Sequence, residues 1–247
     1  DKAVIKKSAL GIHLKSPALQ LNTFDLVEKN ISTTDESWTP VWGEVKQIRN
    51  NYQQLFLRLK TKDEILVNMV FKLFNDGVGF RYEFPQQAKL KHFIIAEETT
   101  QFAVTGDHKT FWIPGDYDTN EYAYYTSKLS EIDATGGKFS QEIHAKTYFN
   151  ANGVQTPLMM KTGENLYINI HEAALVNYPA MNLVIDKSSN ILNAHLVPDA
   201  VGNKAYLQTP SKTPWRTVIV SDKATDILAS KMILNLNEPS KIVNTSW

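Results

Sequence analysis

Polar and apolar side chains alternate along much of this chain, whereas the spacing typical of an amphipathic helix is scarce. The alternating segments are rich in β-branched and aromatic residues, and the clearest are 19–27, 52–60, 64–74, 78–84 and 213–220. Successive side chains of a strand point to opposite faces, so each segment is expected to bury one face. Because many strands without intervening helices cannot build a parallel sheet, the pattern predicts an all-β fold, a sandwich of antiparallel sheets.

Turn residues separate these strands and locate the few other elements. Residues 75–77, Asn-Asp-Gly, lie between the third and fourth segments. Asn and Gly tolerate positive φ, so these two segments are expected to form an antiparallel hairpin. One short helix is predicted over 221–230, with Ser221 as its N-cap and an apolar face made by Ala224, Ile227 and Leu228. Residues 134–153 are polar, contain two adjacent glycines and follow neither period, which predicts a long, mobile loop.

Composition restricts the partners of the chain. The 247 residues include 26 Lys plus Arg and 26 Asp plus Glu, so no overall charge attracts nucleic acid or an anionic membrane. Cysteine is absent, which excludes disulfides, thiolate nucleophiles and Cys-based zinc sites. No segment approaches the roughly 18 consecutive apolar residues of a membrane span, and no HExxH, GxSxG, Walker or GxGxxG motif occurs. We expect one globular domain with a neutral or local partner.

The most unusual stretch is 105–125, in which acidic and aromatic residues are interleaved. Rings stack on the apolar faces of sugars and carboxylates accept hydroxyl hydrogen bonds, so this composition favours a carbohydrate ligand. The candidates are Asp107, His108, Trp112, Asp116, Asp118 and Glu121. The alternative is a Pro-Gly turn with surface acids and packed tyrosines. The spacing of Asp116 and Asp118 suits calcium, but the further ligands of an EF-hand loop are missing, which excludes an EF-hand.

A second candidate lies at the end of the strand predicted in 166–175, LYINIHEAAL. Glu172 continues the apolar row of this strand, whereas His171 belongs to the opposite face. A carboxylate in an apolar row needs water at a strand end, a hydrogen-bonding partner or a cation. The simplest of these is that the strand surfaces at Glu172.

Several longer segments resemble the N-terminal domain of glycoside hydrolase family 97. They are WTPVWGEVKQIRNNY, FKLFNDGVGFRYEFP, FWIPGDYDTNEY, LYINIHEAALVNYPAMNL, LQTPSKTPWRTVIVSD and ILNLNEPSKI, in this order between about Leu10 and Trp247. The resemblance implies a large antiparallel β-super-sandwich, galactose-mutarotase-like, over residues 1–247. In the family a catalytic (β/α)8 barrel and a small C-terminal β domain follow. We expect both to be absent from this chain, together with the first strands of the sandwich.

The resemblance also implies a function. In the α-glucosidase members, which are periplasmic, the glutamate at the position of Glu172 helps to bind Ca²⁺ in the active site of the barrel. The other ligands, the general acid and the general base belong to the barrel. The implied enzyme is an α-glucosidase acting on starch-derived, α-linked oligosaccharides, and this chain alone is expected to be inactive. Asp116, Asp118, Glu121 and His171 are expected to face sugar or the barrel.

Three other interpretations stay open. The first is an α-galactosidase of the same family, because the residues that separate the two activities lie in the barrel. The second is a stand-alone carbohydrate-binding or mutarotase-like module, which needs an acid and a base on either side of the sugar. His171 and Glu172 point to opposite faces and do not suit that pair, whereas His108, Asp107 and Glu121 remain candidates. The third is a purely structural domain that supports the barrel.

Overall fold

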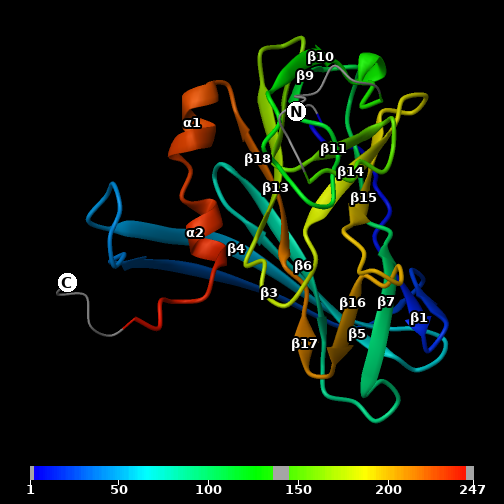
Figure 1. The fold of residues 1–247 in the computed structure, drawn as a ribbon. Coiled ribbons are helices and arrows are strands. Elements are labelled where there is room, and N and C mark those ends of the chain that lie inside the picture. The colour runs from blue at the N-terminus through cyan, green and yellow to red at the C-terminus, as the bar shows by residue number, and fades with distance from the viewer. Residues whose placement is uncertain (1–2, 136–144, 243–247) are drawn as a thin grey trace.

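The computed structural model describes residues 3–135 and 145–242 and contains three antiparallel sheets (Figure 1). The largest has ten strands. In spatial order they are β10 (Tyr125–Lys128), β9 (Lys109–Trp112), β12 (Leu158–Lys161), β13 (Tyr167–Ala173), β18 (Trp215–Ser221), β6 (Gly77–Phe84), β5 (Leu66–Leu73), β4 (Ile48–Lys60) and β3 (Asp25–Trp38), with β17 (Ser211–Lys212) beside β6.

The other two sheets have four strands each. One has the order β16 (Ala205–Gln208), β7 (His92–Glu98), β1 (Ile12–Ser16) and β2 (Leu19–Leu21). The other has the order β11 (Gly153–Gln155), β14 (Met181–Asp186), β15 (Ile191–Leu196) and β8 (Gln101–Ala103). Figure 1 shows both small sheets on one side of the large sheet and the helices on the other.

The main core lies between the large sheet and the two small ones. Alternation places Ile168 and Ile170 of β13 in this core, together with Leu183 of β14 and Ile95 of β7. A smaller core covers the opposite face of the large sheet and includes Trp215 of β18. The predicted all-β sandwich is therefore confirmed, since side chains from facing sheets fill one continuous interior.

The hairpin predicted at residues 75–77 is confirmed, because β5 and β6 pair antiparallel and the Phe74 N–H donates to the Gly77 carbonyl (2.8 Å). The single strand expected over 19–27 is wrong. Residues 19–21 turn back onto β1, and β3 begins only at Asp25 to pair with β4. Of the loop predicted over 134–153, residues 136–144 lie outside the described part of the chain, and no strand occurs in 145–152.

Two short α-helices, α1 (Ala224–Ala229) and α2 (Met232–Leu236), and one 3-10 turn, η1 (Leu129–Glu131), complete the described elements. The predicted helix exists but begins later than expected. Ser221 is not its N-cap, because this residue completes β18 opposite Tyr167. The expected apolar face is also incomplete, since Leu228 is 85% exposed. At six and five residues, neither helix of the described segments is long enough for the roughly 20 residues of a membrane span.

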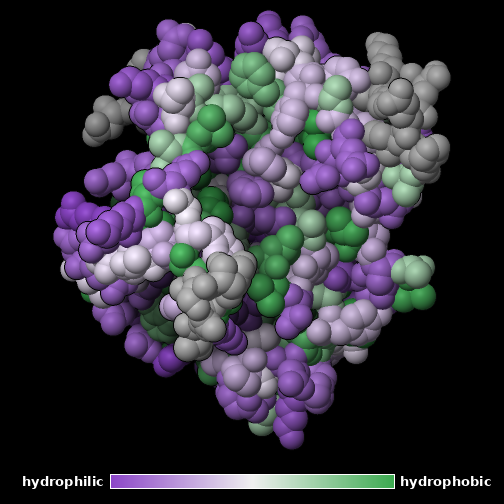
Figure 2. Space-filling model, turned by 60° about the vertical axis from the view of Figure 1, so that its left-hand side comes forward, coloured by the Kyte–Doolittle hydropathy of each residue, from purple (hydrophilic) through white to green (hydrophobic). Residues whose placement is uncertain are grey.

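Apolar side chains also remain exposed on the outermost strand of the large sheet. Leu26, Val27 and Ile31 of β3 are each more than half exposed. Figure 2, in which the left-hand side of Figure 1 comes forward, shows a mostly hydrophilic surface interrupted by separate hydrophobic patches. Exposed apolar side chains gathered on an outer strand are typical of surfaces that another domain covers.

Candidate functional site

Glu172 is buried, and its partner is a guanidinium. Residue 172 lies directly opposite Arg216 in the β13–β18 ladder, and only 7% of Glu172 is exposed. The Arg216 Nη1 donates to Glu172 Oε2 (2.6 Å), and the Met181 N–H donates to Oε1 (3.1 Å). The strand therefore does not reach the surface at Glu172, and the simplest interpretation of the sequence is wrong. A hydrogen-bonding partner compensates the carboxylate instead.

Arg216 is shared between two carboxylates. Its Nε and Nη2 donate to the two oxygens of Glu98 (2.9 and 2.6 Å), and both Arg216 and Glu98 are fully buried. Thr100 and Tyr178 also donate to Glu98 (2.8 and 3.3 Å). Two carboxylates and one guanidinium carry one net negative charge when all three are ionised, so this buried cluster holds an excess acid.

Burial has the largest effect on the pKa of Glu172, and the charge of Arg216 opposes it. Burial raises the pKa of Glu172, and the nearby Arg216 charge only partly opposes this shift because Glu98 takes two of the three guanidinium hydrogen bonds. The same two carboxylates raise the pKa of Arg216 above its ordinary value, although burial opposes this. Arg216 therefore stays charged, and the pKa of Glu172 stays above its ordinary value.

Glu172 lines a cavity of about 820 Å³. Its walls come from the segment after β9, from β11, from the end of β13 and from the start of β14. All five residues that the sequence selected as metal-binding, sugar-facing or interface residues line it: Asp116, Asp118, Glu121, His171 and Glu172. Two segments that are distant in the sequence are thus brought to one cavity.

Asp116 has a structural role within this wall. Its Oδ1 accepts the N–H groups of Asp118 and Thr119 (2.8 and 3.1 Å), and its Oδ2 accepts the hydroxyl of Tyr122 (2.7 Å). Only 4% of Asp116 is exposed. The turn interpretation is therefore correct for Asp116, which shapes the segment that carries the exposed carboxylates of Asp118 and Glu121.

Aromatic packing holds the segment after β9 against the four-stranded sheet that contains β15. Tyr117 and Phe149 stack with ring centroids 4.8 Å apart, and Phe149 stacks on His195 of β15 (4.4 Å). The Tyr117 hydroxyl lies 2.7 Å from His195 Nε2, and His195 Nδ1 lies 2.9 Å from Glu97. The wall of the cavity is therefore fixed to sheet side chains and does not rest on loop contacts alone.

His171 lies on the face opposite Glu172, as alternation predicts. Burial lowers its pKa, and its Nδ1 has no hydrogen-bond partner in the described ranges. The two side chains do not flank one reaction centre as an acid–base pair. His171 is neutral in this setting and forms a separate part of the wall.

Asp107 and His108 do not line the cavity. The Asp107 carboxylate accepts the N–H and hydroxyl of Ser130 (2.8 and 2.7 Å). His108 is buried beside Thr105 (3.1 Å), and burial lowers its pKa. These two residues hold local structure and do not form a mutarotase-like pair with Glu172, whereas the third candidate, Glu121, does line the cavity.

Residues that the sequence analysis missed complete the site. Arg216 was detectable, because it interrupts an apolar row that includes Val218 and Val220. Glu98 was not, because the β1–β7 register shifts between His13 and Leu14, after which Glu98 faces inward opposite Ile12.

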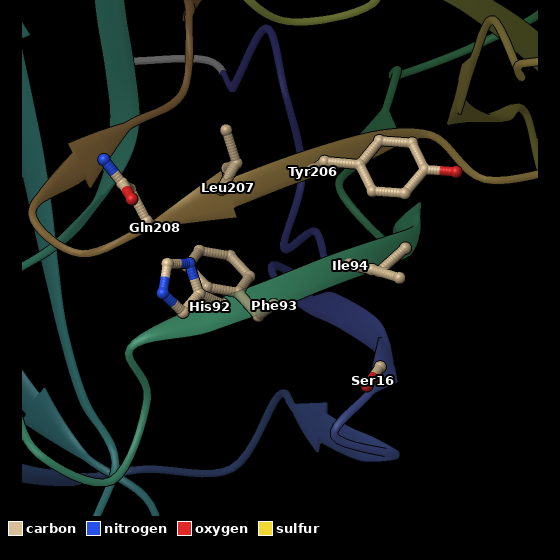
Figure 3. Close-up of a pocket in the computed structure, with 7 residues that line it drawn as sticks. All are labelled: Ser16, His92, Phe93, Ile94, Tyr206, Leu207 and Gln208. Carbon is tan, nitrogen blue, oxygen red and sulfur yellow. The ribbon is translucent and has the colours of Figure 1, made fainter.

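A second hollow, of about 440 Å³, lies on β7 and β16 (Figure 3). Figure 3 shows His92, Phe93 and Ile94 on one strand and Tyr206, Leu207 and Gln208 on the neighbouring strand. No carboxylate lines this hollow within the described residues. It therefore lacks the acidic groups that glycoside chemistry requires.

No cluster of three or more His, Asp or Glu side chains able to hold a metal occurs in residues 3–135 and 145–242. The spacing of Asp116 and Asp118 does not create one, since Asp116 is committed to its turn. Glu172 is the acidic residue that combines burial, a raised pKa and contact with the cavity. It can supply one ligand to a cation, but Ca²⁺ needs six to eight oxygens.

Known proteins resemble both the sequence and the fold. A family model described as Glycosyl-hydrolase 97 N-terminal matches residues 1–239. The chain is 26% identical over 245 residues to a retaining alpha-galactosidase of Bacteroides thetaiotaomicron, and the match covers 87% of this chain and 33% of that protein.

Solved structures give the same result. A glycoside hydrolase family 97 enzyme of Pseudoalteromonas sp. strain K8, in complex with acarbose, is 34% identical with a TM-score of 0.87. The match covers 100% of this chain and 35% of that one, and a variant of the same enzyme was solved with panose. A beta-arabinopyranosidase shares the fold at 19% identity and a TM-score of 0.71, over 90% of this chain and 35% of that one. This chain spans about a third of the length of these relatives, and it belongs to the N-terminal domain family of glycoside hydrolase family 97.

Proposed function

We propose that this domain forms one wall of the active site of an enzyme that hydrolyses the α-glucosidic bonds of starch-derived oligosaccharides. The observation that carries the proposal is Glu172, a buried carboxylate with a raised pKa on the wall of a cavity of about 820 Å³. Perturbed, partly compensated acids in cavities are typical of functional sites.

The domain alone is proposed to be inactive. Glycoside hydrolysis generally uses two carboxyl groups on opposite sides of the scissile bond. Asp116 is engaged in its turn and Glu172 is bound by Arg216, whereas Asp118 and Glu121 lie three residues apart on one segment. This arrangement supplies one wall of a site, and we assign the general acid and the catalytic base or nucleophile to the barrel.

We propose that Glu172 is one ligand of a Ca²⁺ ion held between this domain and the barrel. The excess negative charge of the Glu98–Arg216–Glu172 cluster favours an added cation, and one Glu172 oxygen accepts only a backbone N–H. When bound, such an ion would polarise an oxygen of the substrate or of water. Arg216 then acts by holding Glu172 in place on the cavity wall.

The exposed apolar side chains of β3 are proposed to pack against the catalytic barrel. Leu26, Val27 and Ile31 are exposed apolar side chains of the outermost strand, β3. Apolar side chains gathered on an exposed strand are typical of a surface that another domain covers. The expected periplasmic location stays a prediction.

Glucosides are preferred over galactosides in this proposal. The relative solved with acarbose and panose is 34% identical to this chain, whereas the retaining alpha-galactosidase is 26% identical. Panose is a trisaccharide of α-linked glucose. An α-galactosidase remains the second candidate, supported by the curated relative.

The test is to express this chain alone and as part of the longer protein, with a catalytic barrel, that we propose. We expect the longer protein to hydrolyse 4-nitrophenyl α-glucoside faster than the α-galactoside, and this chain to release no product above the blank. Glu172→Gln in the longer protein should lower kcat/KM by about 100-fold, as for residues that support a bound metal. The matched control is Glu64→Gln, an exposed residue that does not line the cavity. Activity of this chain alone, or equal effects of the two variants, would refute the proposal.

A further inference from the structure

Asn182, which lines the cavity together with Glu172, has a buried polar atom without a hydrogen-bond partner among the described residues. Asn182 follows Met181, whose N–H binds Glu172, and it lines the same cavity. Only 3% of Asn182 is exposed, and its Oδ1 has no hydrogen-bond partner in the part of the chain that the structure describes. Nearly all buried polar atoms in folded proteins are hydrogen-bonded, so this atom calls for an explanation.

The ladder determines where the Asn182 side chain points. Asn182 pairs with Gln155 of β11 on one side and with His195 of β15 on the other, and side chains of such pairs share a face. Gln155 Nε2 donates to the carbonyls of Pro114 and Thr119 (2.9 and 2.7 Å), at the segment that forms the cavity wall. Asn182 is therefore directed to the cavity side, between two polar side chains that do have partners.

We infer that Asn182 binds a sugar hydroxyl in this cavity and is a specificity-determining residue for the α-linked oligosaccharide. This inference rests on the proposed function. A hydroxyl both donates and accepts, so it can satisfy the buried Oδ1 without introducing charge. A neutral polyol suits this position, because the two buried carboxylates of the wall, those of Glu172 and Asp116, already accept hydrogen bonds from Arg216 and from the turn after Asp116.

The inference predicts opposite effects on stability and on recognition. Asn182→Leu keeps nearly the same shape and removes no hydrogen bond of Oδ1, so the melting temperature is expected to stay the same or rise. The control is Asn193→Leu in β15, at a position on the same face of the sheet as Asn182. Its side chain accepts from Gln101 (3.0 Å) and donates to the Val184 carbonyl (3.3 Å), so its removal should lower the melting temperature.

The experiment uses the full-length enzyme and a series of monodeoxy 4-nitrophenyl α-glucosides. For the wild type, removing the hydroxyl that meets Asn182 should lower kcat/KM by about tenfold, the larger effect expected of a buried hydrogen bond. For Asn182→Leu, removing the same hydroxyl should lower kcat/KM by less than about twofold, because the side chain that binds this hydroxyl is already absent. Asn193→Leu should retain the full discrimination.

The inference is wrong if Asn182→Leu discriminates every deoxy substrate as the wild type does, or if it lowers the melting temperature as much as Asn193→Leu. A partner side chain from the barrel would give the first of these results. If the wild type hydrolyses neither the α-glucoside nor the α-galactoside, the proposed function has failed, and the inference fails with it. If the wild type is active and Asn182→Leu discriminates the deoxy substrates as the wild type does, the inference is refuted but the proposed function is not.

Discussion

Arg216→Met offers the sharpest test of how the buried charge cluster stabilises this domain. The substitution keeps much of the apolar stem but removes three charged hydrogen bonds, two to Glu98 and one to Glu172. Breaking a buried ion pair by removing one partner costs about 3–5 kcal/mol, because the other charge is left in a low dielectric. Glu98 keeps hydrogen bonds from Thr100 and Tyr178, so we expect a loss within this range and not twice as large. Such a loss is a large part of the roughly 5–15 kcal/mol that stabilises a typical domain.

The assay is urea unfolding of this chain, read by tryptophan fluorescence, with Arg49→Met as the matched control. Arg49 binds Asp35 through the same two donors, Nε and Nη2, at 2.8 and 2.6 Å. That pair is exposed to solvent, so its loss should change the unfolding midpoint only slightly. Replacing Arg216, Glu98 and Glu172 together by Met, Leu and Leu should recover most of the stability, since no buried charge remains. Equal losses for Arg216→Met and Arg49→Met would refute the reasoning.

Three further changes test other parts of the structure. Burial raises the pKa of Glu172 above its ordinary value of 4.5, so the folded state holds the carboxyl proton more tightly than the unfolded state does. The unfolding free energy should therefore fall as the pH rises from 4.5 towards the folded pKa. Urea titrations over a pH series should show this fall for the wild type but not for Glu172→Gln. A β-carbon on Gly77 would lie 2.3 Å from the Val218 carbonyl oxygen, so Gly77→Ala should destabilise by about 1–3 kcal/mol in urea unfolding, whereas Gly163→Ala, with no atom within 4 Å, should not. Leu158→Ala, at a fully buried position, should cost about 2–5 kcal/mol and lower the calorimetric melting temperature; a change below 1 kcal/mol would contradict the assigned core.

The sequence predicted those parts of the fold that depend on neighbours along the chain. The hairpin at 75–77 follows from turn chemistry, and the burial of Ile168 and Ile170 follows from alternation. The strand expected over 19–27 failed, because alternation continues across the break that returns β2 onto β1. Ser221 failed as an N-cap because the β18 ladder extends to that residue.

The sequence analysis selected residues that line one cavity, but it did not find their bonding partners. Glu172 and Asp118 were selected from separate segments, and the structure places both on one cavity. The partner of Glu172 lies 44 residues away, and Arg216 lies 118 residues from Glu98. Local patterns do not report which distant strands become neighbours, and the register shift in β7 reverses the face that Glu98 would otherwise take.

The most direct test of the central claim, that Glu172 lends its carboxylate to a site completed outside this domain, is calorimetric titration of Ca²⁺. The titration compares this chain with the full-length protein, each as wild type and as Glu172→Gln. We expect the full-length wild type to bind Ca²⁺ tightly, the full-length variant to lose affinity by about tenfold or more, and this chain to bind weakly in either form. Tight binding by this chain alone, or an affinity unaffected by Glu172→Gln in the full-length protein, would contradict the assignment.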